Sequence, residues 1–393
     1  MFRRILVAYD GSAGARTALR IGIDLARQLG AELSSVSVEE PLPRYAATIG
    51  EVEAAKEEID EHFHKLTKEA RDLAALAGGV ELETEVRRGH EVEMILEVAR
   101  GGKFDLLLIG YQGHSRIFER MMGSTALNVA RLTPCSVLIA RPREASGEGV
   151  GAFKRILVGL DGSPLGRLAF QAALDLARLS GGTVIGATVR EVSPLARSEV
   201  PDETYVHQLQ TAATEHARAA GVVFDGIIRT GHAAQALCDQ ARDGRADLIV
   251  LGATGLEHPW SATLGGTATR VASEAPCSIL LVRFPRAVLH VRDVMVRGVS
   301  SVTLDTPLAE VVELLLRRNV KALPVVDARQ HVVGIITGGD LLDRTDLELR
   351  LSIQRELHAD TLRERLRGLA RSPKAARDVM TRPVHTVEAD VDL

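Results

Sequence analysis

An internal repeat constrains the fold of this 393-residue chain more strongly than any other feature of its sequence. The segment Phe2-Arg-Arg-Ile-Leu-Val-Ala-Tyr-Asp10-Gly-Ser returns as Phe153-Lys-Arg-Ile-Leu-Val-Gly-Leu-Asp161-Gly-Ser. Further along, Asp105-Leu-Leu-Leu-Ile-Gly110 returns as Asp247-Leu-Ile-Val-Leu-Gly252. We place the first copy at residues 1–142 and the second at residues 153–284, joined by a Gly-rich linker. Whatever fold one copy adopts, the chain has to contain it twice.

Each copy alternates short apolar runs with longer amphipathic stretches. Apolar runs predict strands, and apolar residues that recur every three or four positions predict helices. In the first copy the predicted strands are residues 5–8, 33–38, 80–86, 106–109 and 136–140, and the predicted helices are residues 15–29, 51–77, 92–99 and 124–131. Five strands alternating with helices indicate a parallel sheet with helices on both faces. The predicted fold class of each copy is therefore α/β, with a five-stranded, Rossmann-like sheet.

A glycine motif follows the fourth predicted strand of the first copy. Gly110-Tyr-Gln-Gly113 is followed by nine residues and then by Gly123-Ser-Thr125, which opens a helix. Glycines let a backbone approach a phosphate closely, and the N–H groups at a helix N-terminus bind anions. Asp10 ends the first strand and lies across the same crevice, where it suits a ribose hydroxyl or a metal-bound water. The alternative is that these glycines are turn residues and Ser124 is an ordinary helix cap.

The second copy keeps the glycine spacing but loses one hydroxyl. Its motif is Gly252-Ala-Thr-Gly255, nine residues, and then Gly265-Gly-Thr267. Thr267 matches Thr125, whereas Gly266 stands where the first copy has Ser124. We therefore expect the second site to bind phosphate more weakly than the first.

Both copies resemble the universal stress protein family, and specifically its ATP-binding branch, which is marked by this glycine spacing. The resemblance implies a nucleotide-binding α/β fold with ATP, with or without Mg²⁺, held at the carboxyl ends of the strands. In the first copy the family's binding positions map onto Ala8, Tyr9, Asp10, Val38, Gly110, Gly113, Gly123, Ser124 and Thr125. In the second copy they map onto Asp161, Val189, Gly252, Gly255, Gly265 and Thr267, with Gly266 departing from the pattern. Members commonly pair through their last strand, which implies a homodimer or, for tandem copies, an intramolecular pseudo-dimer.

A third region spans residues 287–393 and resembles a cystathionine-β-synthase (CBS) domain, an α+β module. Its motif covers residues 291–342 and ends in Thr337-Gly-Gly-Asp340, where the family uses the Thr and the Asp on an adenosine ribose. The resemblance implies that AMP or another adenylate binds here. The alternative is a strand end followed by a helix cap. A second CBS motif begins near residue 376 and is cut short, so we expect this region to be truncated or to depend on another chain.

Composition excludes several other classes of function. The net charge of −4 gives no basic field for nucleic acid, and 3% aromatic residues are too few for base-stacking surfaces. Three well-separated cysteines do not suit a zinc or disulfide framework, and they fit a reducing cytoplasm. No apolar run approaches the length of a membrane span, and the N-terminus does not read as a signal peptide.

Three functional classes therefore stay open from the sequence. The first is a nucleotide-binding regulator that responds to adenylate level, the second is a slow ATPase, and the third is a stress-induced scaffold with vestigial sites. The sequence favours the regulator, because no Walker loop and no obvious general base stands in the glycine loop.

Overall fold

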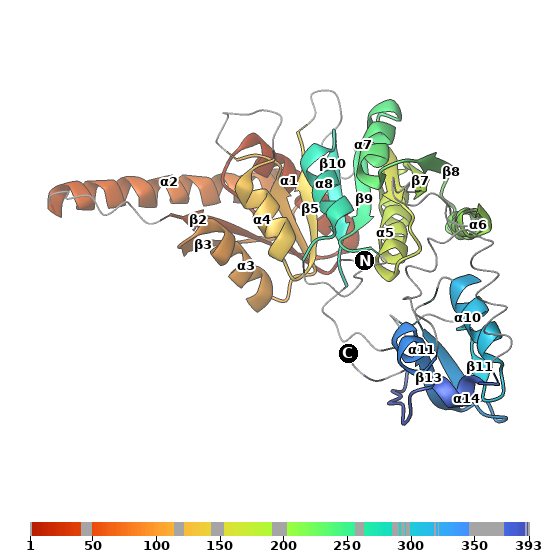
Figure 1. Cartoon of the computed structure of the whole chain (residues 1–393). Coiled ribbons are helices and arrows are strands. Elements are labelled where there is room, and N and C mark those ends of the chain that lie inside the picture. Colours follow the sequence, from red (N-terminus) through yellow and green to blue (C-terminus); the bar gives the residue numbers. More distant parts are fainter. Residues whose placement is uncertain are drawn as a thin grey trace. The chain divides into compact units, whose positions relative to one another are not determined.

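The computed structural model describes most of the chain (Figure 1). The described residues are 2–40, 49–113, 122–142, 153–190, 203–255, 263–284, 291, 295, 299–317, 320, 322–345, 373–389 and 391. The predicted linker between the two copies, residues 143–152, lies outside them. The chain forms two compact units, of which the first holds both repeats and the second holds the C-terminal region.

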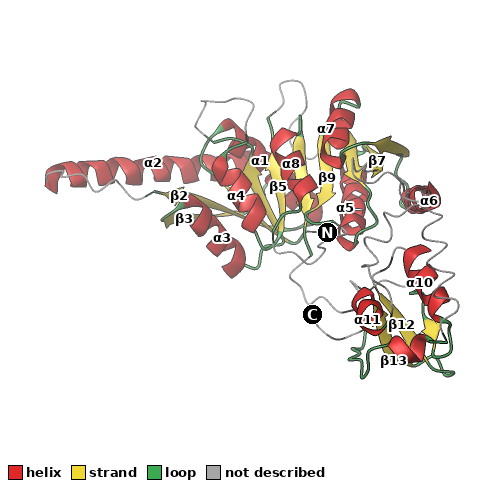
Figure 2. Ribbon diagram, in the orientation of Figure 1, coloured by secondary structure: helices red, strands yellow, loops and turns green. Residues whose placement is uncertain are grey.

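The first repeat folds as the alternating pattern predicts (Figure 2). Its elements are β1 (Arg4–Ala8), α1 (Ala13–Leu29), β2 (Glu32–Glu39), α2 (Ile49–Leu76), β3 (Leu82–Arg88), α3 (Glu91–Gly101), β4 (Leu106–Gly110), α4 (Ser124–Leu132) and β5 (Ser136–Ala140). The strands lie in the order β3-β2-β1-β4-β5, and every neighbouring pair is parallel. The α/β class predicted for the repeat is confirmed.

The second repeat has the same architecture. Its elements are β6 (Arg155–Gly159), α5 (Pro164–Ser180), β7 (Thr183–Arg190), α6 (Glu203–Ala219), β8 (Phe224–Thr230), α7 (Ala233–Asp243), β9 (Leu248–Gly252), α8 (Gly266–Glu274) and β10 (Ser278–Val282). Its strands lie in the order β10-β9-β6-β7-β8, again parallel throughout.

Two hydrophobic cores fill the faces of the sheet. Side chains of α1, α2, α5 and α6 pack in one core, and side chains of α3, α4, α7 and α8 pack in the other. The central strands are buried on both faces, which explains why their sequences are continuously apolar. Local signals fix the ends of α1: the Ser12 hydroxyl accepts from the Ala15 N–H, and Gly30 closes the helix in the left-handed region.

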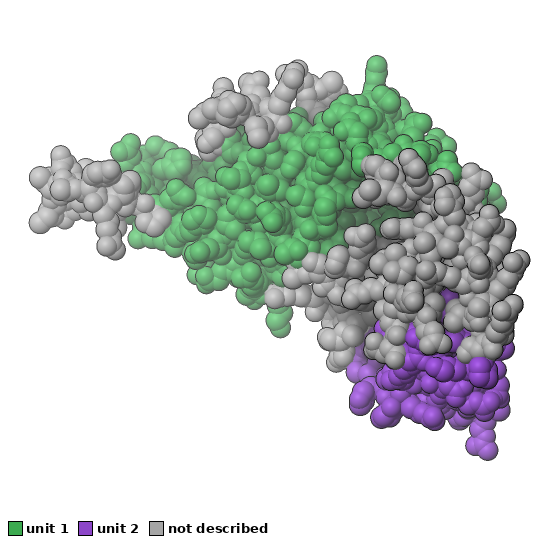
Figure 3. Space-filling view, in the orientation of Figure 1, with its two compact units in different colours: residues 1–192, 201–287 green, residues 193–200, 288–393 purple. Residues whose placement is uncertain are grey.

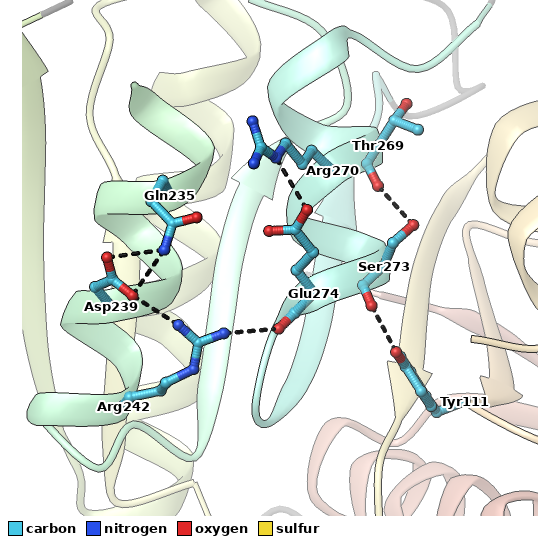
Figure 4. Close-up of polar contacts among 8 residues, drawn as sticks. All are labelled: Tyr111, Gln235, Asp239, Arg242, Thr269, Arg270, Ser273 and Glu274. Carbon is cyan, nitrogen blue, oxygen red and sulfur yellow. Dashed lines mark hydrogen bonds and ion pairs between the residues drawn. The ribbon is translucent and has the colours of Figure 1, made fainter. Parts of the chain in front are cut away.

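The two repeats share one ten-stranded sheet, because β5 and β10 pair antiparallel. Side chains reinforce the junction (Figure 4). The hydroxyl of the buried Tyr111 donates to the Ser273 carbonyl on α8 at 2.7 Å, as the figure shows. The Arg141 guanidinium also lies 4.0 Å from the centre of the Tyr111 ring. On α8 itself, Arg270 pairs with Glu274. The pairing of last strands expected of tandem copies is thus found within this chain.

The second compact unit, purple in Figure 3, is small, and its described elements include both helices and strands. Its elements are β11 (Val302–Thr303), α10 (Leu308–Arg317), β12 (Ala322–Val326), β13 (Val332–Thr337), α11 (Gly338–Arg344) and α14 (Ala376–Val379). The three strands form a sheet in which β11 and β12 are parallel and β12 and β13 antiparallel. The restarted motif near residue 376 forms α14, and its Ala376, Val379 and Met380 join the core of this unit.

Candidate functional site

The residues predicted for the first nucleotide site line one cavity, which we call site 1. The cavity has a volume of about 480 Å³ and lies at the carboxyl ends of β1, β2 and β4 and at the N-terminus of α4. Its lining includes every predicted residue, namely Ala8, Tyr9, Asp10, Val38, Gly110, Gly113, Gly123, Ser124 and Thr125. Ligands of open α/β sheets bind at this place, because the loops that follow parallel strands meet there.

Gly123 holds the turn into α4. It is the N-cap of the helix, and its N–H donates to the Tyr111 carbonyl at 2.9 Å. Its φ of −62° suits any residue, and an added Cβ would lie 3.6 Å from the nearest heavy atom. Protein packing therefore does not require glycine here, whereas a ligand placed against the first turn of α4 would.

Gly110 has a packing role besides the one that its motif suggests. A Cβ at this position would lie 2.7 Å from the Gly14 carbonyl carbon and 2.8 Å from the Ala15 nitrogen, both in the backbone of α1. Glycine is thus needed for the close packing of α1 against β4, independently of any ligand. In the second repeat, a Cβ on Gly252 would lie 2.9 Å from the Leu165 carbonyl carbon in the backbone of α5.

Asp10 lies beside the glycine loop. Its Oδ1 accepts from the Ser12 N–H at 2.9 Å, which fixes the turn into α1. A Cβ on Gly113 would lie 2.9 Å from Asp10 Oδ2, so the carboxylate lies directly beside the glycine loop in the lining of site 1. The side chain is exposed, and it can therefore accept hydrogen bonds from a bound hydroxyl.

Tyr9 contributes less polar chemistry to site 1 than its position suggests. Its hydroxyl donates to Glu69 Oε1 at 2.8 Å, and Arg16 pairs with the same carboxylate at 2.6 Å. Burial, and then the hydrogen bond to Glu69, raise the pKa of Tyr9. The phenol therefore joins α1 and α2 to β1 and stays neutral.

Site 1 contains one charged residue that the sequence motif does not predict. Glu91 is the first residue of α3 and lines the cavity, and its Oε2 accepts from the Thr125 hydroxyl at 2.8 Å. A signal exists in the repeat: Gly89-His90 is followed by Glu91, whereas Gly231-His232 is followed by Ala233. Its meaning appears only when α3 packs beside α4.

The second repeat forms the matching cavity, which we call site 2. Its volume is about 690 Å³, and its lining includes all the predicted residues: Asp161, Val189, Gly252, Gly255, Gly265 and Thr267. Gly265 repeats the geometry of Gly123, since its N–H donates to the Ala253 carbonyl at 2.9 Å and an added Cβ would have 3.6 Å of space. Asp161 accepts from the Ser163 N–H, as Asp10 does from Ser12. The sequence repeat is thus a repeat of the cavity.

Thr337 and Asp340 of the second unit form a helix cap. The Asp340 carboxylate accepts from the Thr337 N–H at 2.8 Å and from the Thr337 hydroxyl at 2.7 Å, and the Asp340 N–H donates back to that hydroxyl. The other carboxylate oxygen accepts from the Thr381 hydroxyl. Burial by itself raises the pKa of Asp340, but the hydrogen bonds from Thr337 and Thr381 outweigh it and hold the pKa below its usual value.

We expect Asp340→Ala to destabilise the second unit by about 1–3 kcal/mol, because two hydroxyls and an N–H lose their acceptor. The folded-state pKa is lowered, so the contribution of Asp340 is present above its unfolded pKa and is lost as the pH falls through the folded value. Urea unfolding of the second unit at pH 7 and at acid pH measures this. The difference between wild type and Asp340→Ala should shrink on acidification; an equal difference at both pH values would contradict the role of the carboxylate.

Other chemistry has little support in the described part of the chain. Its His, Cys, Asp and Glu residues include no group of three that is placed to hold a metal ion. Cys135, Cys238 and Cys277 are all buried, and burial raises the pKa of the Cys238 thiol to about 11. Among the helices that the structure describes, none is both long enough and apolar enough to span a bilayer.

Comparisons with known proteins agree with this architecture. The family model described as "Universal stress protein family" matches residues 1–141 and 152–283, and the CBS domain model matches residues 291–345. A universal stress protein of Thermus aquaticus is 35% identical over 141 residues, which are 36% of this chain and 100% of that protein. A universal stress protein of Mycobacterium tuberculosis strain H37Rv is 26% identical over 285 residues, covering 72% of this chain and 96% of that protein.

A solved structure shows the same fold. The crystal structure of a universal stress protein from Archaeoglobus fulgidus aligns with a TM-score of 0.56 at 18% sequence identity, covering 72% of this chain and 97% of that one. The two segments matched by the family model are therefore the two repeats that share one sheet and that each form one cavity. The chain belongs to the universal stress protein family, with two tandem stress-protein domains followed by a CBS domain.

Proposed function

We propose that this protein is an adenine-nucleotide-binding regulator of a stress response, with ATP bound in sites 1 and 2. One observation carries the proposal: the same cavity is built twice, each time at a helix N-terminus that follows a glycine loop. Both volumes, about 480 and 690 Å³, lie in the range typical of ligand pockets. Backbone N–H groups at these helix N-termini suit phosphate, and both copies present them because the glycine spacing before the helix is the same.

The rest of each cavity suits a nucleoside. Val38 and Ala8 give site 1 an apolar wall on β1 and β2, against which we place the adenine. The exposed carboxylate of Asp10 stands beside the loop and accepts from ribose hydroxyls in this arrangement. Site 2 offers Val189 and Asp161 in the same positions.

A magnesium ion fits the donors of site 1 if the nucleotide supplies further ligands. Asp10 and Glu91 both line the cavity, and carboxylates are the oxygen ligands that Mg²⁺ prefers. Magnesium is usually held by one or two carboxylates together with phosphates and waters. The ion would reduce the charge of the triphosphate beside the α4 N-terminus.

We propose further that the CBS domain senses AMP or another adenylate through Thr337 and Asp340, and that the protein acts in the cytoplasm. Since Asp340 already accepts from Thr337 and Thr381, ribose would have to replace or share these hydrogen bonds. The stress domains act as a pseudo-dimer within the chain, which is supported by the pairing of β5 and β10.

Calorimetric titration of the full chain tests the proposal. Of the two stress-domain sites, Gly265→Val leaves only site 1 open, and Gly123→Val leaves only site 2. With Mg²⁺ present we expect ATP to bind site 1 about tenfold more tightly or better, because Ser124 supplies a hydroxyl donor that Gly266 lacks, and such a bond to a charged group contributes about 1.5–3 kcal/mol.

A matched variant checks the cause of this difference. A Cβ on Gly266 would meet no atom within 4 Å, so Gly266→Ser fits without strain and should strengthen site 2 toward the affinity of site 1. A second site that binds as tightly as the first in the unaltered chain would refute the expected order. If neither Gly265→Val nor Gly123→Val binds ATP, ADP or AMP, the proposed function is wrong.

A further inference from the structure

The described linings of the two cavities differ by one carboxylate. Among the described residues that line them, the charged ones are Asp10 and Glu91 in site 1 and Asp161 alone in site 2. Asp10 and Asp161 are equivalent, so Glu91 is the difference, and Ala233 holds its place in the second repeat. Neither set of described lining residues contains a Lys or an Arg. The charge of a bound phosphate therefore meets different surroundings in the two cavities.

Glu91 stands next to the place where phosphate is expected. Its Oε2 is 2.8 Å from the hydroxyl oxygen of Thr125, the second residue of α4. The N–H groups of this first turn are the anion-binding groups of site 1. A phosphate bound to them lies within a few ångströms of the Glu91 carboxylate, at a distance where two negative charges in a partly buried site repel strongly.

The hydrogen bond also changes what Thr125 offers a ligand. A hydroxyl has one hydrogen, and that of Thr125 is donated to Glu91. Toward a phosphate oxygen Thr125 then presents lone pairs, which do not bind an anion. In the second repeat, Thr267 has no such acceptor at position 233, because the residue is Ala.

We propose that Glu91 is a charge-selectivity residue that makes nucleotide binding in site 1 depend on a divalent cation, whereas site 2 accepts the metal-free nucleotide. This inference rests on the proposed function. A cation bound by both the phosphates and Glu91 replaces the repulsion between the two anions by attraction of each to the cation. Glu91 then no longer needs the Thr125 hydrogen, and the Thr125 hydroxyl can donate to phosphate. Without the cation, the carboxylate opposes a triphosphate.

The test compares ATP binding in EDTA and in Mg²⁺, at matched ionic strength, in the full chain. Gly265→Val isolates site 1, where we expect ATP to bind at least tenfold more weakly in EDTA. In the same background, Glu91→Gln keeps an acceptor for Thr125 but removes the charge. We expect Glu91→Gln to strengthen ATP binding in EDTA. The ratio of ATP affinity in Mg²⁺ to that in EDTA should then come close to the ratio for site 2. Glu91→Ala is the second variant and should do the same.

The reciprocal experiment uses the natural difference between the repeats. Gly123→Val isolates site 2, where ATP should bind with little dependence on Mg²⁺, and Ala233→Glu should introduce the dependence found in site 1. Adenosine, which carries no phosphate, is the control probe and should bind every variant equally in EDTA and in Mg²⁺.

The outcomes separate the inference from the function on which it rests. If ATP binding depends on Mg²⁺ equally in Glu91→Gln and in the Gly265→Val parent, the role of Glu91 is overturned. The proposal that site 1 binds ATP then still stands. Adenosine affinity that changes with Glu91 in the same way as ATP affinity also overturns it, because the effect is then not one of phosphate charge. If the parent chain binds neither adenosine nor ATP, the proposed function and this inference both fail.

Discussion

Gly123→Val is expected to weaken ATP binding in site 1 by well over tenfold, which corresponds to about 1.4 kcal/mol or more, while the fold stays intact. The isopropyl group would stand at the N-cap of α4, over the N–H groups that we assign to the phosphates. The protein itself has room for the added Cβ, because the backbone φ is −62° and the nearest heavy atom to a Cβ is 3.6 Å away. The substitution should therefore reduce ATP binding much more than it reduces the stability of the fold.

Calorimetry of the full chain measures the loss of binding, and thermal unfolding shows whether the fold is kept. The matched control is Gly265→Val, which has the same geometry in the second repeat and should leave site 1 untouched. A cost of at most about 1 kcal/mol in stability is expected, since valine is a poorer N-cap residue than glycine. If a folded Gly123→Val protein binds ATP with unchanged affinity, the assignment of the phosphate site to the α4 N-terminus is wrong.

Periodicity predicted the central strands to within a residue, because buried parallel strands are continuously apolar. The strand predicted at residues 136–140 is β5 as observed, and that predicted at residues 106–109 is β4 with Gly110 added. The strand predicted at residues 80–86 is found at Leu82–Arg88. This strand lies at an edge of the sheet and ends in exposed Arg87 and Arg88, so its C-terminal end carries no apolar signal.

The site was predictable where its residues form a contiguous motif. The glycine spacing located the loop and the α4 N-terminus, and the repeat located their second copies. Glu91 was not predictable in the same way, since its contact with Thr125 depends on how α3 packs beside α4. The Thr337-Gly-Gly-Asp340 pattern fits both a ribose ligand and a helix cap, and the structure shows the cap. A sequence motif records residue types, whereas these roles depend on neighbours that are distant in the chain.

Gly110 shows the same limit within the glycine motif itself, and its replacement should have the largest effect on stability. A Cβ there would lie 2.7 to 3.0 Å from three backbone atoms of Gly14 and Ala15, which no change of rotamer can relieve. Helix α1 would have to move away from β4 at a place where both are fully packed. We expect Gly110→Ala to cost about 1–3 kcal/mol, the usual range for overpacking, and Gly110→Val to cost more.

Urea unfolding measures this cost as a fall in the transition midpoint with an unchanged slope. Gly123→Val is the control from the same motif, and we expect the two variants to separate the two reasons for glycine: Gly110→Ala loses stability, whereas Gly123→Val loses ligand. Gly252→Ala should repeat the loss of stability, because its Cβ would lie 2.9 Å from the Leu165 backbone of α5. A Gly110→Ala protein as stable as the wild type would show that α1 and β4 can separate without cost, and that Gly110 is retained for the ligand after all.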